Sequence, residues 1–150
     1  MRLRSAYLSL ETGNPQAALA ECSKILESPS AGEGVNFSVD AFFRHISSDL
    51  LERDFFSRFA LYFKGVAYLE MGSMDEAMHA AADLKSSIQK GITEDGMELY
   101  DELKGMIELK KRNYSKAIKY FHKALSLLPS QRSIVPLVDN HALFIYSLAK

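Results

Sequence analysis

The sequence predicts an all-α fold of stacked antiparallel helix pairs, and three observations lead to this prediction. The first is internal similarity: the segment from Leu61 resembles the segment from Asp101, and Gly65 and Ala77 both recur 40 residues later. The second is the helical spacing of apolar residues between residues that start and stop helices. The third is the absence of sustained two-residue alternation, so we expect no strands.

Two further copies of the pattern lie at the ends of the chain. Near the start, Gly13 and Ala18 match Gly72 and Ala77, and near the end Ser147 stands 42 residues after the glycine at 105. A fixed period of this kind is the mark of a repeat protein. The sequence therefore predicts helix pairs at about 1–28, 56–91 and 95–129, and the first helix of a fourth pair at about 136–150.

Helix boundaries support these repeats independently. The starts combine capping residues with a proline or a capping box, and the stops are glycine and proline. The starts are Asn14-Pro15, Ser73 with Glu76, and Asn113; the stops are Gly91 and Pro129. Two apolar stripes lie between them: Met74, Ala77, Met78, Ala81, Leu84 and Ile88, then Ala117, Ile118, Phe121, Ala124, Leu125 and Leu128.

One stretch departs from the regular spacing. Ala18 and Ala77 are 59 residues apart, about 25 more than the roughly 34 residues of a simple two-helix repeat. Ser38 is a suitable cap for a helix striped by Phe42 and Ile46. We therefore expect an inserted amphipathic helix at about 38–54, within a single domain covering residues 1–150.

Composition excludes several classes of function. Hydrophobic residues make up 47% of the chain, which is enough to form a core. The net charge is -1 and no block of like charge stands out, so we expect no nucleic-acid partner. No apolar run approaches the roughly 18 residues of a membrane span. Cys22 is the only cysteine, so no intrachain disulfide can form, and a soluble, cytoplasmic protein is expected.

The repeated residues resemble the tetratricopeptide repeat. That family has Gly-x2-Tyr in the first helix and Ala-x3-Phe in the second, followed by proline. The matching residues are Gly65, Tyr68, Gly72 and Ala77 in one copy, and Gly105, Ala117, Phe121, Ala124 and Pro129 in the next. The early tryptophan of the motif is replaced by Leu61 and Asp101, and its tyrosine by Glu108 in the third pair.

The resemblance implies a right-handed superhelix, an α-solenoid of about three and a half repeats with one inserted helix. It also implies a non-catalytic scaffold in a larger protein, which binds a peptide or a partner helix on a concave face lined by the first helix of each pair. By register, the partner-binding residues are Tyr7, Leu10, Phe59, Tyr62, Val66, Leu69, Leu99, Met106 and Leu109. The alternative is that these residues are ordinary core, or are covered by the inserted helix.

Some repeats of this family clamp a terminal carboxylate with lysines, an arginine and asparagines. The corresponding positions here are Leu3, Tyr7, Phe63, Leu99 and Leu103. None of these side chains donates a charge-assisted hydrogen bond. The sequence therefore disfavours this class of ligand.

The sequence gives no support for catalysis, a metal or a cofactor. The histidines, His45, His79, His122 and His141, are scattered without metal-binding spacing. Cys22 occupies a helix-packing position and is expected to be a small buried hydrophobe. The acidic residues Glu98, Asp101, Glu102 and Glu108 share one helical stretch, and we expect them to form a solvated face.

Two other functions remain open. A solenoid normally ends in a polar capping helix, and this chain stops at Lys150 after half a repeat. Phe144, Ile145 and Leu148 would then be partly uncovered, and they are expected either to continue into more protein or to form a homodimer. The chain is then a self-association or spacer module, or a regulatory accessory domain of a multidomain protein such as a kinase or peptidase.

Overall fold

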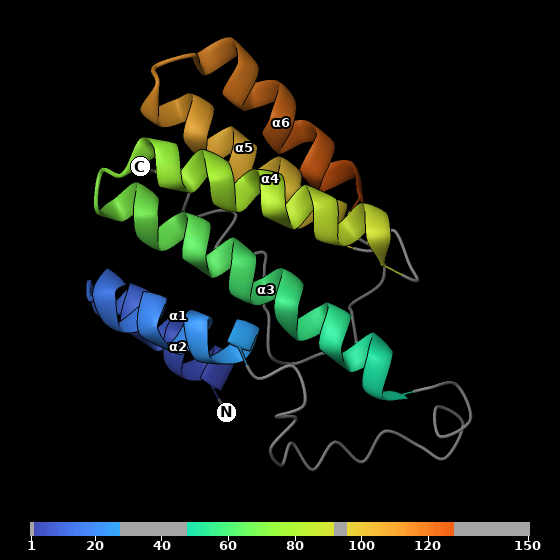
Figure 1. The fold of residues 1–150 in the computed structure, drawn as a ribbon. Coiled ribbons are helices and arrows are strands. Elements are labelled where there is room, and N and C mark those ends of the chain that lie inside the picture. The colour runs from blue at the N-terminus through green and yellow to red at the C-terminus, as the bar shows by residue number, and fades with distance from the viewer. Residues whose placement is uncertain (1, 28–47, 92–95, 128–150) are drawn as a thin grey trace.

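The computed structural model describes residues 2–27, 48–91 and 96–127, and within them it contains six α-helices and no strand. This confirms the all-α prediction (Figure 1). The helices are α1 (Arg2–Glu11), α2 (Pro15–Glu27), α3 (Ser48–Glu70), α4 (Met74–Lys90), α5 (Met97–Lys110) and α6 (Tyr114–Leu127). The predicted helix at 136–150 and the stop at Pro129 lie outside the described residues.

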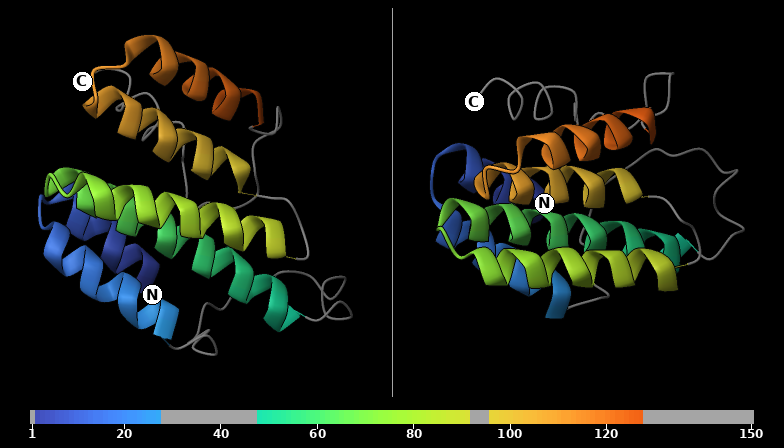
Figure 2. Two further views of the ribbon diagram at one scale, coloured as in Figure 1. Left: turned by 45° about the horizontal axis from the view of Figure 1, so that its top comes forward. Right: turned by 90° about the horizontal axis from the view of Figure 1, so that it is seen from above.

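The six helices form three consecutive antiparallel pairs. The most extensive contacts are within the pairs α1–α2, α3–α4 and α5–α6, and the contact of α2 with α3 is nearly as large. Contacts of α4 with α5, and of α3 with α5 and α1, join neighbouring pairs. Figure 2 shows the three pairs following one another through the molecule. The described chain is therefore a helical repeat in which first helices neighbour first helices.

The long helix α3 changes one predicted boundary. The sequence suggested an inserted helix ending near residue 54 and a new helix from residue 56, but α3 is continuous from Ser48 to Glu70. At 1.5 Å per residue, these 23 residues span about 35 Å. No glycine or proline interrupts the segment, so nothing in its sequence ends the helix. Residues 38–47 of the predicted insertion lie outside the described residues.

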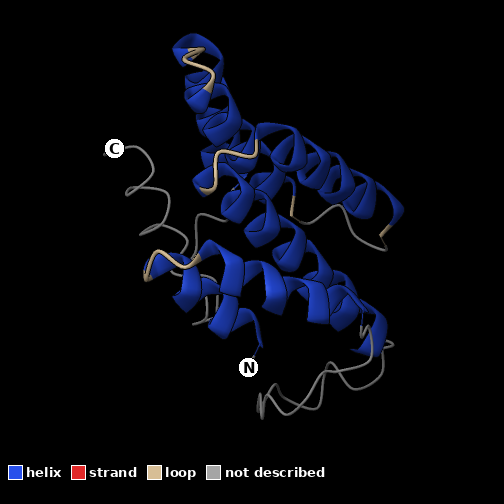
Figure 3. Cartoon of the chain, turned by 60° about the vertical axis from the view of Figure 1, so that its left-hand side comes forward, coloured by secondary structure: helices blue, strands red, loops and turns tan. Residues whose placement is uncertain are grey.

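The same turn joins the two helices of each pair. Gly13, Gly72 and Arg112 occupy equivalent left-handed positions, with φ of 70°, 78° and 61°. In each turn this residue donates its N–H to the carbonyl three residues back, and the next residue donates to the carbonyl five residues back. This is the Schellman pattern, which satisfies the last carbonyls of a helix. Figure 3 shows these turns between the helices.

Capping of the second helices follows the prediction only in part. Asn14 caps α2, since its Oδ1 accepts the N–H of Ala17 at 3.2 Å. Ser73 stands at the N-cap of α4, but its side chain makes no capping hydrogen bond, so the predicted capping box is wrong. The side-chain amide of Asn113 instead donates to Glu108 Oε2 at 2.9 Å. Gly91 ends α4 as predicted.

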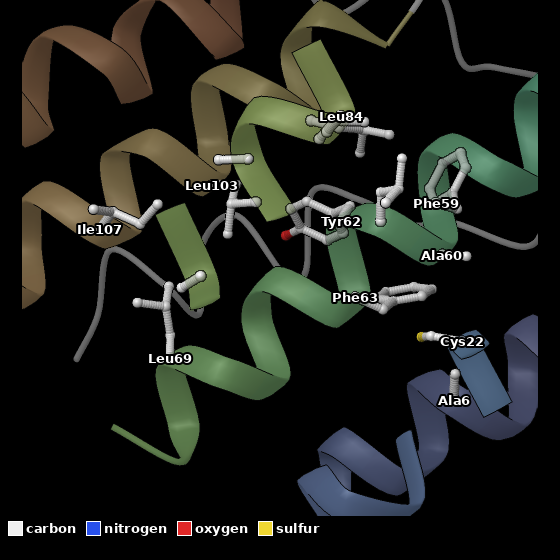
Figure 4. Packing of buried hydrophobic residues seen from close by; sticks show 14 of the residues in the cluster. Ala6, Cys22, Phe59, Ala60, Tyr62, Phe63, Leu69, Leu84, Leu103 and Ile107 are labelled. Carbon is white, nitrogen blue, oxygen red and sulfur yellow. The ribbon is translucent and has the colours of Figure 1, made fainter. Parts of the chain in front are cut away.

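The core forms where small residues let helices approach. A Cβ on Gly65 of α3 would lie 2.5 Å from Leu103 Cδ2 of α5, and one on Gly105 would lie 2.6 Å from Phe121 Cε1. Figure 4 shows Phe63 facing Cys22 and Ala6 of the first pair. The predicted packing role of the two repeated glycines is therefore confirmed, because neither position has room for a side chain.

The two predicted apolar stripes differ in their outcome. In α4, the side chains of Ala77, Ala81, Leu84 and Ile88 are buried, as predicted. In α6, Ala117, Phe121 and Ala124 are buried, but Ile118 is 54% exposed and Leu125 39% exposed. The apolar surface of α6 is therefore wider than its contact with α5.

Candidate partner-binding face

The predicted partner-binding residues all lie on the first helix of a pair. Tyr7 and Leu10 are on α1, whereas Met106 and Leu109 are on α5. The other four, Phe59, Tyr62, Val66 and Leu69, follow helical spacing along α3. Because α3 contacts both α1 and α5, the structure brings these three groups onto neighbouring helices.

Burial divides these residues into two sets. Phe59, Tyr62 and Leu69 are only 8%, 4% and 3% exposed, so in this structure they serve as core. The other five side chains are half-buried and pack against the core from its edge. They are Tyr7, Leu10, Val66, Met106 and Leu109. Leu99, which the register also placed on this face, is 2% exposed and belongs to the core.

A row of aromatic rings supports the face from α3. Phe55, Phe59 and Phe63 follow one another at four-residue spacing, with ring centroids 4.7 and 6.2 Å apart. The row continues to α1, because the Tyr7 ring lies 6.2 Å from that of Phe63. These distances fall in the range of favourable aromatic pairs. The row therefore fixes α1 against α3 at this edge of the face.

The acidic residues of α5 contradict the prediction of a solvated face. Asp101, Glu102 and Glu108 are 0%, 4% and 8% exposed, and Glu98 is half-buried. The mistake has a physical reason. The acidic residues are spread around α5, and this helix is enclosed by α3, α4 and α6 instead of lying at the surface.

The pair Tyr62–Glu102 is the feature of this face that the sequence analysis missed. The Tyr62 hydroxyl donates a hydrogen bond to the Glu102 carboxylate, across the contact between α3 and α5. Burial raises the pKa of Glu102 from 4.5 to about 7, although the Tyr62 hydrogen bond opposes this rise. Burial also raises the pKa of Tyr62 well above 10.0. Within the described residues, Glu102 Oε1 has no hydrogen-bond partner.

The repeat period was the signal that pointed to this pair. Tyr62 and Glu102 are 40 residues apart, the same separation as Gly65 and Gly105. Residues at the same register of neighbouring first helices face each other in a stacked repeat. The period therefore places these two side chains together, even though neither is unusual by itself.

Cys22 behaves as predicted. The side chain is fully buried, and burial raises the pKa of its thiol to about 12. Because the thiolate is the reactive form, this thiol is a packing residue at neutral pH.

The described residues offer little for other chemistry. His79 and His122 are exposed, and no group of three or more potential metal ligands occurs in the described segments. The positions that would clamp a carboxylate are apolar and mostly enclosed, since Phe63, Leu99 and Leu103 are each at most 6% exposed. No helix in the described part of the chain is long and apolar enough to cross a bilayer.

The fold and this face define a helical-repeat protein, whose first helices lie side by side. Residues 102–131, which include most of α5 and all of α6, match the family model described as the tetratricopeptide repeat. This match supports the family suggested by the sequence motifs, over the segment that it covers. No curated protein and no solved structure gives a significant match to the chain.

Proposed function

We propose that this chain is a protein-interaction module that binds a peptide or a partner helix on the face formed by α1, α3 and α5. The observation that carries the proposal is the set of half-buried apolar side chains on these three helices: Tyr7, Leu10, Val66, Met106 and Leu109. The tetratricopeptide match supports a protein-binding, non-catalytic role in general. The surface chosen here rests on the register of the repeats.

The chemistry of the face favours an apolar ligand. Complete burial of an aliphatic or aromatic side chain contributes about 1.5–3 kcal/mol, and a half-buried residue gains part of that when a partner covers it. Side chains spaced along parallel helices suit an amphipathic helix that presents apolar residues at every third or fourth position. The partner is therefore proposed to bind through a few aliphatic or aromatic anchors.

Selection of binding peptides, followed by mapping, tests this proposal. Peptides that bind the chain would be selected from a displayed library of helical sequences. Their contacts would then be mapped by NMR on methyl-labelled protein. We expect the largest shifts at Leu10, Val66 and Met106, and none at Ile118 and Leu125 of α6. Shifts confined to α6, or a library that yields no binder, would contradict the proposal.

A matched pair of variants tests the same face by affinity. Val66→Asp introduces a charge among half-buried apolar side chains and is expected to weaken peptide binding at least about tenfold. Ala20→Asp makes the same chemical change at an exposed position of α2 and is expected to leave binding unchanged. Circular dichroism of both variants shows whether the fold is retained.

Self-association is a second candidate function, favoured by the exposed apolar side chains of α6. Tyr114, Ile118 and Leu125 are 59%, 54% and 39% exposed and lie on one side of the helix. The residues to which the sequence assigned self-association, Phe144, Ile145 and Leu148, lie outside the described residues. Light scattering over a concentration series would compare the parent chain with Ile118→Glu and Phe144→Glu. A dimer that either variant dissociates supports this function, and a monomeric parent chain excludes it.

A further inference from the structure

A second surface of the molecule gathers lysine and tyrosine side chains across α4, α5 and α6. A depression of about 220 Å³ lies between α4 and α5, and its lining includes Lys85, Tyr100 and Lys104. Another depression, of about 390 Å³, lies between α5 and α6, and its lining includes Lys116, Lys119 and Tyr120. By helical spacing, Tyr100 and Lys104 lie on the opposite side of α5 from Glu102 and Met106. This surface is therefore separate from the proposed partner-binding face.

Contacts between lysines and tyrosines join the two depressions. Lys85 Nζ of α4 lies 5.5 Å from the centre of the Tyr100 ring, and Lys104 Nζ of α5 lies 5.9 Å from the centre of the Tyr120 ring. Both distances are within the range of a cation–π interaction. Such an interaction positions an ammonium group without cancelling its charge. The series Lys85, Tyr100, Lys104 and Tyr120 therefore forms a positively charged strip across three helices.

The helix α6 adds most of the remaining charge. Lys116, Lys119 and Lys123 lie on one side of this helix, together with Tyr120, and α6 contains no acidic residue. At the other edge, Lys111 Nζ lies 3.1 Å from the sulfur of Met78, which lines the first depression. The lysine–tyrosine surface thus comprises Lys85, Tyr100, Lys104, Lys111, Lys116, Lys119, Tyr120 and Lys123.

The carboxylates beside this surface leave most of its charge unbalanced. Asp101 is fully buried and pairs with Lys123, at 3.0 Å between Nζ and Oδ2. Glu108 lines the second depression but is only 8% exposed, and it accepts the Asn113 amide. Among the described residues, Lys85, Lys104, Lys116 and Lys119 have no carboxylate within salt-bridge distance. These four ammonium groups are therefore available to an external anion.

We propose that the lysine–tyrosine surface is a docking site for an acidic segment of a partner protein, with carboxylates against the lysines and an aliphatic side chain between α4 and α5. Charge complementarity selects the acidic ligand, and the depression beside Met78, Ala81 and Ala82 supplies the apolar contact. A protein segment fits better than a nucleic acid, because Lys85 and Lys104 already occupy faces of the two tyrosine rings. Bases would have to displace these lysines in order to stack.

Fluorescence anisotropy with a defined probe tests the proposal on the complete chain. The probe is a labelled peptide in which glutamates alternate with leucines. The reference probes are the same peptide with glutamine in place of glutamate, and a single-stranded oligothymidylate of similar length. We expect the acidic peptide to bind, its affinity to fall as salt rises, and the glutamine peptide not to bind. Tighter binding of the oligonucleotide, or no binding of the acidic peptide, would overturn the proposal.

Two double variants locate the binding. Lys104→Gln with Lys119→Gln removes one ammonium from each depression and is expected to weaken peptide binding about fivefold, the effect of losing two exposed ion pairs. Lys24→Gln with Lys64→Gln removes the same charge from α2 and α3 and is expected to have no effect. Equal effects of the two double variants would mean that only net charge matters, and the proposal would fail.

NMR of the Met78 methyl group gives an independent readout. This methyl group lies in the first depression and is expected to shift when the acidic peptide binds, whereas Val66 is expected to stay unchanged. A shift at Val66 without one at Met78 would place the acidic peptide on the other face and overturn the assignment.

Discussion

Replacement of Glu102 by glutamine is expected to remove a pH-dependent loss of stability. Glu102 is 4% exposed, and burial raises the pKa of its carboxyl group from 4.5 in the unfolded chain to about 7 in the folded protein. The folded state therefore binds the proton more tightly than the unfolded state. As a result, the free energy of unfolding is highest below pH 4.5, falls between pH 4.5 and about 7, and is constant above that range.

The size of this loss follows from the two pKa values. At about 1.4 kcal/mol for each pKa unit, the difference between 4.5 and about 7 corresponds to about 3 kcal/mol. Glutamine keeps an acceptor for the Tyr62 hydroxyl but never ionises. Its amide N–H groups take the place of the unpartnered Oε1, which adds a cost of about 1–3 kcal/mol that is the same at every pH. The informative quantity is therefore how the difference between the parent chain and the variant changes with pH.

Urea unfolding followed by circular dichroism measures this change. Relative to the parent chain, we expect Glu102→Gln to gain about 3 kcal/mol in unfolding free energy between about pH 4.5 and pH 8. Glu27→Gln, which changes an exposed carboxylate at the end of α2, is the matched control and is expected to show no such gain. A constant difference between Glu102→Gln and the parent chain would refute the burial argument. A carboxyl resonance of Glu102 that titrates near pH 4.5 would refute it as well.

Three further predictions concern single positions in the repeats. Arg112→Gly is expected to raise the unfolding free energy by about 1 kcal/mol, since Arg112 alone among the three equivalent turn residues holds a left-handed φ with a side chain. In a urea series, Gly72→Ala should lower the same quantity by a similar amount. Gly105→Ala should lower it by about 1–2 kcal/mol, because its Cβ would meet the Phe121 ring. The Cys22 thiol, whose pKa is raised to about 12, should react with a disulfide reagent at neutral pH only as fast as the chain unfolds.

Local sequence patterns predicted the helices well where they described the backbone. The turn glycines Gly13 and Gly72 and the cap Asn14 stand where the repeats suggested, because these residues act on their own backbone. The third turn has Arg112 in place of glycine, and the surrounding helices hold it in the left-handed conformation. Here tertiary packing overrides the local preference, so the sequence alone could not identify this turn residue.

Burial of charge was the property that sequence patterns predicted least well. An acidic helix face is normally solvated, and the enclosure of Asp101 and Glu102 follows only from the positions of α3 and α6 around α5. The lysine–tyrosine surface has the same origin. Its lysines are separated by apolar and neutral residues along the chain, so no charged block is visible until three helices are placed side by side.

The helix α5 shows how one short element serves both proposed surfaces. Met106 lies on the side that continues the face of α1 and α3, whereas Lys104 lies on the side that faces the depressions beside α4 and α6. Between these sides, Leu103 fills the space left by Gly65, and it fixes the rotation of α5 about its own axis. Because that packing holds both sides in place, an apolar partner and an acidic segment could bind the same module together. Simultaneous binding of a selected helical peptide and the glutamate–leucine peptide, with additive anisotropy signals, is the expected result. Mutual exclusion would mean that the two ligands share one face.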